Sequence, residues 1–358
     1  MNNNTIVLTG GGTAGHVSLN EAIIPELLKK DYTVHYIGSH NGIEKSIIQK
    51  NFPFISYHAI SNGKLRRYFS IKNFSDPFKV LYGTLQALSV LRKVKPSIVF
   101  SKGGFVSVPV VLAAKLMNIP VVIHESDITP GLANKISINF AEQIFTVFEE
   151  TLKYLPKEKA TSIGAIIRTD LFHGDEQLAE QITGLQATKE TIIVMGGSQG
   201  SAKINEVIKE NIDVLTKRYQ IIHLCGKGNL DATLVGKPNY VAFEYVTDEL
   251  PHLLKMANYV ITRAGSNSIF EFLELKKPML LIPLSIQASR GDQILNAKFF
   301  EEKGYALMLE EENLTPITFM EFMKKLVDNK EEIIDKQCSA SSSKTPEQFT
   351  ELLLTYKK

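Results

Sequence analysis

Short runs of β-branched and apolar residues alternate with helical patterns along the chain, and the alternation starts again after residue 164. In the first half the pattern predicts strands at 5–9, 33–37, 97–100, 121–124, 144–147 and 161–163. In the second half it predicts strands at 191–194, 220–224, 240–243, 259–261 and 279–282. Helices are expected at 18–30, 202–217, 249–256, 268–275, 292–303 and 345–356. Successive βα units of this kind form parallel sheets.

The repeated pattern predicts an α/β protein of two Rossmann-like, doubly wound parallel-sheet domains that face a cleft. We place the joint between 164 and 190, where residues 168–189 form a charged and irregular segment with Gly174 and Gly184. Pro25 lies inside the first expected helix and should kink or split it.

Composition fits a folded cytoplasmic protein and excludes several classes. The 358 residues suit two domains, and 44% hydrophobic with 22% charged residues is ordinary for globular proteins. A net charge of +2 gives no argument for nucleic acid as a partner. Cys225 and Cys338 stand far apart without metal spacing, which fits a reducing compartment. We expect no signal peptide and no bilayer-spanning segment, so any membrane contact is from one side.

The stretch Gly196-Gly-Ser-Gln-Gly-Ser201 follows an expected strand and precedes an expected helix. In this arrangement backbone N–H groups and the helix dipole point at an anion, usually a phosphate. A ligand-free βα turn needs the same small residues, so the stretch alone leaves both interpretations open.

A second glycine-rich loop, Gly10-Gly-Gly-Thr-Ala-Gly-His16, follows the first expected strand. It lacks the Gly-Lys-Ser/Thr of a P-loop, and no acidic residue ends the second strand to hold a ribose. The dinucleotide interpretation is therefore weak, and with it an NAD(P) oxidoreductase. His16 stands at a helix start, where the dipole favours a neutral imidazole that can accept a proton, although it could also simply cap or pack.

Further polar clusters follow other expected strands. They are Ser101–Ser107, His124–Asp127, Thr129–Lys135, Arg263–Glu271 and Arg290–Gln293. Because ligands bind at the carboxyl ends of strands in open α/β sheets, these clusters favour a ligand in the cleft between the domains. A carboxylate such as Glu271 suits ribose hydroxyls because it only accepts hydrogen bonds.

Basic and aromatic residues interleave in the stretch from Ser61 to Tyr82. The residues that we assign to membrane contact are Lys64, Arg66, Arg67, Tyr68, Phe69 and Lys72. Such a mixture suits an anionic membrane surface. Single-stranded nucleic acid or an ordinary solvated helix would use the same residue types.

Seven motifs occur together in the order seen in the peptidoglycan enzymes of glycosyltransferase family 28, which the chain resembles over nearly its whole length. The motifs lie at 10–16, 103–109, 124–125, 131–135, 196–200, 263–266 and 292–293. The resemblance implies a GT-B fold with an acceptor and membrane-facing domain at 1–165 and a donor-binding domain at 166–340. It also implies that a last helix, at about 341–358, joins the first domain.

The implied activity moves N-acetylglucosamine from UDP-GlcNAc to undecaprenyl-pyrophosphoryl-MurNAc-pentapeptide, converting lipid I to lipid II. The implied location is the cytoplasmic face of the cell membrane, with UDP-GlcNAc, undecaprenyl-linked lipid I and cell-wall synthesis machinery as partners. No cofactor is implied, and the matching loops lack an Asp-x-Asp pair that would call for a metal.

The resemblance also carries residue roles. The donor contacts fall on Thr13, Ala14, Gly15, Arg168, Ser198, Val246, Ser266, Asn267, Ser268, Ile269, Phe270, Glu271 and Gln293. Asp127 stands where the family commonly has asparagine, and we place it with Asn134 as a contact to acceptor or donor. The implied inverting reaction needs one base, which we assign to His16, with Glu125 as the second candidate or as an orienting partner.

Two other functions share parts of this pattern. A UDP-GlcNAc epimerase has the same architecture without need of a lipid surface, and free ManNAc as a product would identify it. A non-catalytic nucleotide-sugar-binding membrane subunit would need only one of the two sets of motifs.

Overall fold

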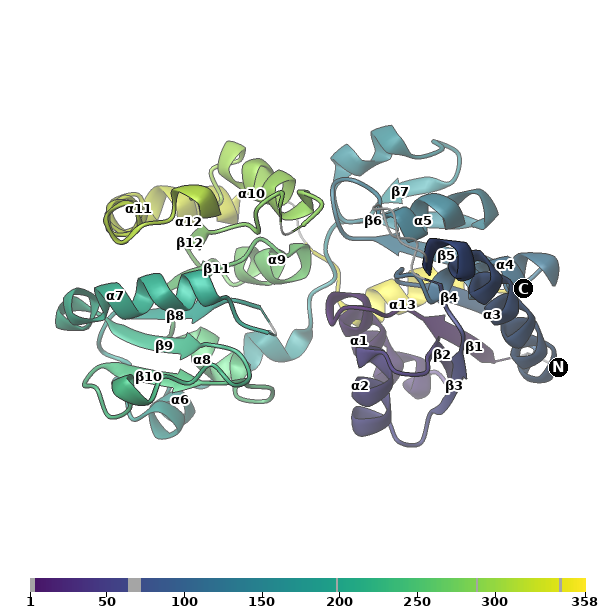
Figure 1. The fold of residues 1–358 in the computed structure, drawn as a ribbon, viewed down its shortest axis with the longest axis horizontal. Coiled ribbons are helices and arrows are strands. Elements are labelled where there is room, and N and C mark those ends of the chain that lie inside the picture. The colour runs from purple at the N-terminus through teal and green to yellow at the C-terminus, as the bar shows by residue number, and fades with distance from the viewer. Residues whose placement is uncertain (1–3, 64–71, 198, 288, 341–342) are drawn as a thin grey trace. The chain divides into compact units, whose positions relative to one another are not determined.

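The computed structural model describes residues 4–63, 72–197, 199–287, 289–340 and 343–358, without the side chains of 72–75. The chain forms two compact units (Figure 1). Unit 1 consists of Met1–Ile166 and Ser343–Lys358, and unit 2 of Ile167–Ser342. None of the helices in the described ranges combines the length and hydrophobicity that a membrane span requires.

Unit 1 is built on a seven-stranded sheet in the order β3-β2-β1-β4-β5-β6-β7, with every pair parallel. Its strands are β1 (Thr5–Thr9), β2 (Thr33–Ser39), β3 (Ser56–Ile60), β4 (Ile98–Ser101), β5 (Val121–Glu125), β6 (Gln143–Thr146) and β7 (Ala160–Ser162). Its helices are α1 (Gly15–Lys29), α2 (Ile43–Asn51), α3 (Lys72–Val94), α4 (Ser107–Leu116), α5 (Leu132–Ser137) and α13 (Pro346–Leu354).

Unit 2 is built on a six-stranded parallel sheet in the order β10-β9-β8-β11-β12-β13. Its strands are β8 (Thr191–Met195), β9 (Gln220–Leu224), β10 (Tyr240–Phe243), β11 (Tyr259–Thr262), β12 (Met279–Leu281) and β13 (Leu307–Met308). Its helices are α6 (Glu176–Thr183), α7 (Ala202–Arg218), α8 (Leu250–Met256), α9 (Ser266–Glu274), α10 (Asp292–Glu302), α11 (Pro316–Asp328) and α12 (Lys330–Cys338).

Short 3-10 helices complete the chain. They are η1 (Ile138–Phe140), η2 (Glu149–Tyr154), η3 (Thr169–His173), η4 (Ala232–Leu234) and η5 (Glu311–Asn313).

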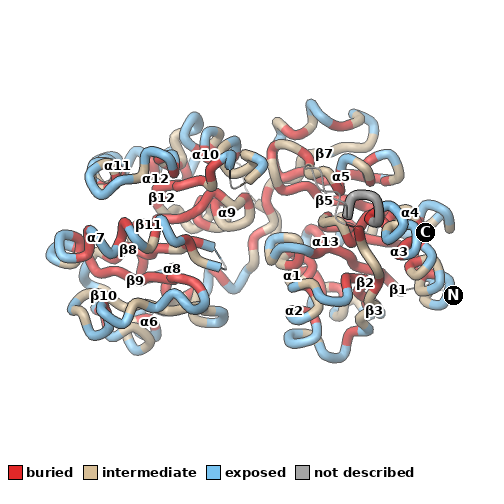
Figure 2. The backbone as a smooth tube through the Cα atoms, viewed as in Figure 1, coloured by how far each residue is buried: buried red, intermediate tan, exposed pale blue. Residues whose placement is uncertain are grey.

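Both sheets have the same topology, in which the first strand of the unit lies in the middle and the fourth lies beside it. The direction of the strand order therefore reverses between β1 and β4 in unit 1 and between β8 and β11 in unit 2. Ligands bind at such switch points, at the carboxyl ends of the strands. Figure 2 shows the central strands mainly in red, so their residues are buried. The exposed polar residues near the strand ends therefore belong to the loops that follow the strands.

The last helix, α13, packs against α1 in unit 1. Figure 1 shows it in yellow among the purple and blue elements of the first half of the chain. Phe349 is fully buried there, with its ring against those of Phe100, Phe145 and His124. A segment that follows all of unit 2 thus completes the core of unit 1.

The predicted fold class of two doubly wound α/β domains is confirmed, and the structure differs from the local predictions at three places. Residues 168–189 are not irregular throughout, because they contain α6. The Asp175 carboxylate accepts hydrogen bonds from the N–H groups of Gln177 and Leu178, and Gly184 ends the helix in the left-handed conformation. The helix with Pro25 is not split, since α1 runs unbroken from Gly15 to Lys29. Two strands, β3 and β13, were not predicted.

Candidate active site

The glycine-rich loop of unit 1 connects β1 to α1, at the switch point between β1 and β4. The N–H of Gly11 donates to the carbonyl of Gly103 (3.2 Å), which ties this loop to the one after β4. His16 Nδ1 lies 2.8 Å from the carbonyl oxygen of Gly11. Because a carbonyl oxygen only accepts, Nδ1 carries the proton, and Nε2 holds the lone pair of the neutral imidazole. In this tautomer, Nε2 is the ring nitrogen with the lone pair.

The three donor contacts predicted in this loop lie at the start of α1. Thr13 and Gly15 are exposed, and Ala14 is half-buried at the N-cap position, where its side chain offers no cap. The structure therefore leaves this edge of the loop open to a ligand.

Glu125 organises the loop that follows β5. Its Oε1 accepts the N–H groups of Ser126 (2.9 Å) and Asp127 (3.1 Å), and its Oε2 accepts the N–H of Gly131 (2.9 Å) and Nδ2 of Asn134 (2.9 Å). Burial and the neighbouring Asp127 raise the pKa of Glu125, although these donors oppose the shift. A carboxylate with four donors has few electron pairs left for a substrate proton, so the geometry favours the orienting role over that of the base.

A buried lysine that the sequence analysis did not select lies beside this loop. Lys102, directly after β4, is 3% exposed, and its Nζ contacts Ser126 Oγ. Burial lowers its pKa to about 8, against the opposing attraction of Glu125 and Asp127. A lysine between a buried strand and two glycines, Gly103 and Gly104, was the signal that could have identified it.

Two further groups at this edge are buried. The Oδ1 atom of Asn134 and both ring nitrogens of His124 have no hydrogen-bond partner among the described residues. Burial and the nearby Lys102 hold the pKa of His124 well below its usual value, so the imidazole is neutral. Asn134 Oδ1 is buried as well as unpartnered in the described part of the chain, so it is an acceptor inside the loop and not an exposed contact.

The glycine loop of unit 2 connects β8 to α7, at the switch point between β8 and β11. Gly197 and Gly200 have φ angles of 93° and 75°, and a Cβ on Gly200 would lie 2.0 Å from the carbonyl oxygen of Cys225. Ser201 caps α7, its Oγ accepting the N–H of Ile204 (3.4 Å). Strand, glycine turn and helix start are therefore arranged as a phosphate site requires. Ser198 lies outside the described residues.

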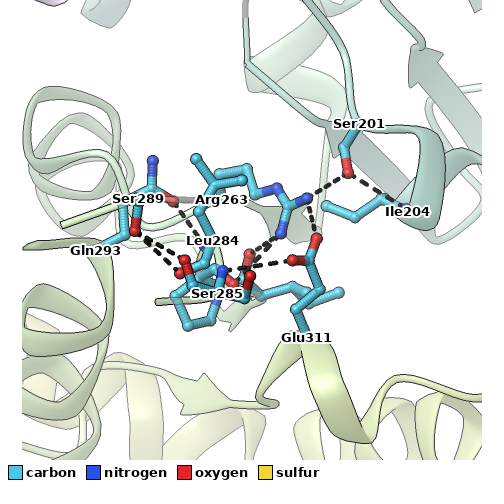
Figure 3. A network of polar contacts seen from close by, with 10 residues as sticks. Ser201, Ile204, Arg263, Leu284, Ser285, Ser289, Gln293 and Glu311 are labelled. Atoms are coloured by element: carbon cyan, nitrogen blue, oxygen red, sulfur yellow. Dashed lines mark hydrogen bonds and ion pairs between the residues drawn. The ribbon is translucent and has the colours of Figure 1, made fainter. Parts of the chain in front are cut away.

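Arg263 joins this loop to two others through a buried network (Figure 3). Its Nη2 donates to Ser201 Oγ (2.7 Å) and pairs with Glu311 Oε1, while Nη1 donates to the carbonyl of Ile282 (3.0 Å). Burial acts to raise the pKa of Glu311, but Arg263 outweighs it and lowers the pKa. The motif at 263–266 is visible in the sequence, but no sequence pattern predicts that Arg263 and Glu311 hold the glycine loop of unit 2.

Two predicted donor contacts from different elements lie together in unit 2. Arg168 Nε is 3.6 Å from Glu271 Oε1 on α9. Burial raises the pKa of Glu271, and the positive charge of Arg168 opposes that shift. A partly exposed carboxylate fixed by one arginine can still accept hydrogen bonds from adjacent hydroxyls.

The remaining predicted contacts of unit 2 differ in exposure. Asn267, Ser268, Phe270 and Val246 are half-buried, and Ser266 is buried at the first position of α9. Ile269 is the least accessible of these predicted contacts. Its side chain is fully buried, and its N–H donates to the Gly265 carbonyl.

Gln293, at the start of α10, is fixed at one end. Its Oε1 accepts the N–H of Leu284 (3.1 Å) (Figure 3). The Nε2 group is therefore the end that points away from this bond and can donate to a sugar hydroxyl.

The predicted membrane contacts Lys64, Arg66, Arg67, Tyr68 and Phe69 lie outside the described residues. Lys72 begins α3, but its side chain is not described.

Two family models match the chain in succession. The glycosyltransferase family 28 N-terminal domain matches residues 6–146, and the glycosyltransferase family 28 C-terminal domain matches residues 191–352. The chain belongs to glycosyltransferase family 28.

Curated relatives of this family 28 protein match it over nearly their full length. One from Clostridium tetani is 52% identical over 98% of both chains, and one from Staphylococcus carnosus is 56% identical over 92% of this chain and 90% of its own. Both are named UDP-N-acetylglucosamine–N-acetylmuramyl-(pentapeptide) pyrophosphoryl-undecaprenol N-acetylglucosamine transferase. Among solved structures, the MurG of Acinetobacter baumannii shares the fold, with a TM-score of 0.78, 22% identity, and coverage of 98% of this chain and 99% of its own.

Proposed function

We propose that this protein transfers N-acetylglucosamine from UDP-GlcNAc to the C4 hydroxyl of MurNAc in undecaprenyl-pyrophosphoryl-MurNAc-pentapeptide, converting lipid I to lipid II. The observation that carries the proposal is the full-length identity of 52% and 56% to enzymes named for this transfer. The arrangement of groups in each unit supports it.

Unit 2 would bind the donor. The backbone N–H groups at 196–201 and the N-terminus of α7 would hold the diphosphate and stabilise the charge that develops when UDP leaves. Glu271, oriented by Arg168 at 3.6 Å, would accept the ribose hydroxyls, and Nε2 of Gln293 would donate to the sugar. The Arg263–Glu311 pair would hold the phosphate loop in place through Ser201.

Unit 1 would supply the base. Nε2 of His16 takes the proton of the C4 hydroxyl while that oxygen attacks C1 of N-acetylglucosamine, and the bond from C1 to the UDP oxygen breaks. One displacement of this kind inverts the anomeric carbon, so an α-linked donor gives a β-linked product. Asp127 would contact the acceptor from the loop that Glu125 and Asn134 hold.

The activity is tested with purified protein, labelled UDP-GlcNAc and a short-chain lipid I analogue. A labelled disaccharide lipid is the expected product, and free ManNAc without it would contradict the proposal. The variant His16→Asn should lower kcat by about 100-fold or more while UDP-GlcNAc binding, followed by calorimetry, stays intact. Near-normal kcat in this variant would remove His16 as the base.

We also propose that the protein works at the cytoplasmic face of the membrane, held there peripherally by α3. Phe78, Leu81, Tyr82 and Leu85 recur at helical spacing on α3 and are each between 56% and 74% exposed. An exposed apolar stripe of this kind, which follows the basic stretch at 64–72 in the sequence, suits an anionic bilayer surface.

Liposomes with and without anionic lipid test this assignment. The double variant Leu81→Glu/Leu85→Glu should lose vesicle binding, as should neutralisation of Lys64, Arg66 and Arg67. The matched control is Ile317→Glu, which places a charge at an exposed apolar position of unit 2. Unchanged vesicle binding in both the leucine variant and the neutralised variant would refute the assignment of this surface to membrane contact.

A further inference from the structure

A buried carboxylate lies beneath the glycine loop of unit 1. Glu44, in the first turn of α2, is 1% exposed. Its Oε2 accepts the N–H of Gly12 (3.1 Å), and its Oε1 accepts the N–H of Ser39 (3.0 Å) and the Ser39 hydroxyl. In nucleotide-binding folds of this topology, the N–H groups of the corresponding loop hold a phosphate. In this protein the N–H of Gly12 is bound by the Glu44 carboxylate and not by a phosphate.

The surrounding backbone is shaped for this carboxylate. A Cβ on Gly11 would lie 2.5 Å from the carboxyl carbon of Glu44, and a Cβ on Gly42 would lie 2.2 Å from its oxygens. Any side chain at either position would collide with the acid, so two glycines on different elements permit its approach. The contact is therefore a built feature of the loop.

The Gly11–Gly12 peptide connects Glu44 to His16. Its N–H belongs to Gly12 and donates to Glu44, while its C=O belongs to Gly11 and accepts Nδ1–H of His16 at 2.8 Å. The two ends of a trans peptide point in opposite directions, so one planar group has the carboxylate on one side and the imidazole on the other. Hydrogen bonds joined through a polarisable group strengthen one another.

We infer that Glu44 is a positioning residue for His16, acting through the Gly11–Gly12 peptide to fix the Nδ1–H tautomer and to stabilise the imidazolium formed when Nε2 takes a proton. The inference rests on the proposed role of His16 as the base. A carboxylate bonded directly to a histidine does the same in many enzymes, and here a peptide group stands between the two.

Other ionisable groups around the loop do not compete for this role. Tyr36 donates to the Gly10 carbonyl (2.7 Å) and Tyr57 to the Ser39 carbonyl (2.7 Å), and burial raises the pKa of both phenols, so both stay neutral. The Cβ of Lys102 lies 3.1 Å from where a Cβ on Gly10 would be, and its Nζ contacts Ser126 Oγ instead of the Gly11–Gly12 peptide.

The variant Glu44→Gln isolates the contact to Gly12. Two donors of Ser39 face one carboxylate oxygen, and one donor of Gly12 faces the other. The single amide oxygen of glutamine is expected to turn toward Ser39, which leaves its NH2 group against the N–H of Gly12. The matched control is Ser39→Ala, which removes a hydroxyl from the same cradle and keeps the carboxylate on Gly12.

The experiment follows His16 by nitrogen-15 NMR in the full-length protein, with the His16→Asn spectrum identifying its signals among the eight histidines. In Glu44→Gln the titration midpoint of His16 should fall by roughly half a unit or more. The kcat should fall about 10- to 100-fold, the range for loss of an outer partner of a functional histidine, with KM for UDP-GlcNAc unchanged. Ser39→Ala should keep both properties.

The outcomes separate this inference from the proposed function. An unchanged midpoint in Glu44→Gln, or an equal shift in Ser39→Ala, overturns the link. A shifted midpoint with unchanged kcat supports the link and removes His16 as the base. If Glu44→Gln does not fold, the nitrogen-15 spectrum of the unsubstituted protein still tests the inference. A predominant Nε2–H tautomer of His16 in that spectrum overturns it.

Discussion

The buried charge of Lys102 should cost unit 1 stability, so the variant Lys102→Met should be more stable than the natural protein at neutral pH. The folded protein holds the pKa at about 8 instead of 10.5, a difference of about 2.5 units. At about 1.4 kcal/mol per unit, the charged form costs about 3 kcal/mol. The variant also loses the hydrogen bond to Ser126 Oγ, which reduces the gain in stability by about 1 kcal/mol. The expected net gain is therefore about 2 kcal/mol.

The gain should depend on pH with a defined sign. The unfolded chain binds this proton more tightly than the folded protein, so the cost is complete below pH 8 and declines as the pH rises toward 10.5. By pH 9.5 the folded lysine has lost its charge, and the advantage of methionine should fall by about 2 kcal/mol, to near zero.

The assay is hydrogen exchange in urea, read on peptides from β4 and β5, because global unfolding of a two-unit chain is not two-state. The control Lys115→Met changes an exposed lysine in the same unit and should alter stability little. A loss of stability in Lys102→Met at pH 7, or a gain that is the same at pH 9.5, would refute the reasoning.

Three other predictions concern unit 2. Replacing Arg263 by methionine leaves Glu311 buried without its partner, so exchange of β11 peptides should report a loss of about 3–5 kcal/mol. Burial lowers the pKa of His223 to about 4, so the unfolded chain binds the proton more tightly. Between pH 7.5 and 5.5 unit 2 should therefore lose about 1 kcal/mol, and His223→Gln should remove this dependence. Glu271→Gln should weaken UDP-GlcNAc binding about 10- to 100-fold in calorimetry but leave an analogue without ribose hydroxyls unaffected.

The strands were the most predictable part of the fold, because buried parallel strands are continuous β-branched runs. The prediction at 220–224 matches β9, whose residues are all buried. The prediction at 240–243 matches β10, an edge strand that is half-buried but still carries an apolar run. In contrast, β3 (Ser56–Ile60) is half-buried at the edge of its sheet and carries no such run. The helix α6 was missed because its capping residues, Asp175 and Gly184, were read as loop residues rather than as helix boundaries.

The location of the site could be predicted, but the hydrogen bonds and ion pairs within it could not. Polar clusters after β1, β5, β8 and β11 follow from the rule for switch points. The contact of Glu44 with Gly12 spans 32 residues and depends on where α2 packs, which no local pattern encodes. Likewise, Arg168 and Glu271 were predicted as donor contacts without any contact to each other, and their ion pair forms only when η3 and α9 are folded.

The return of α13 to unit 1 has a consequence for synthesis. The residues from 167 to 342 leave the ribosome before Phe349 does. Until then the core of unit 1 lacks the ring that packs against Phe100, Phe145 and His124. Domains otherwise tend to fold in order as they emerge. In this chain, unit 2 can reach its native state while the nascent unit 1 still exposes aromatic surface to chaperones. Loss of α13 by proteolysis or premature termination would therefore destabilise the N-terminal part of the chain, where the proposed base His16 lies.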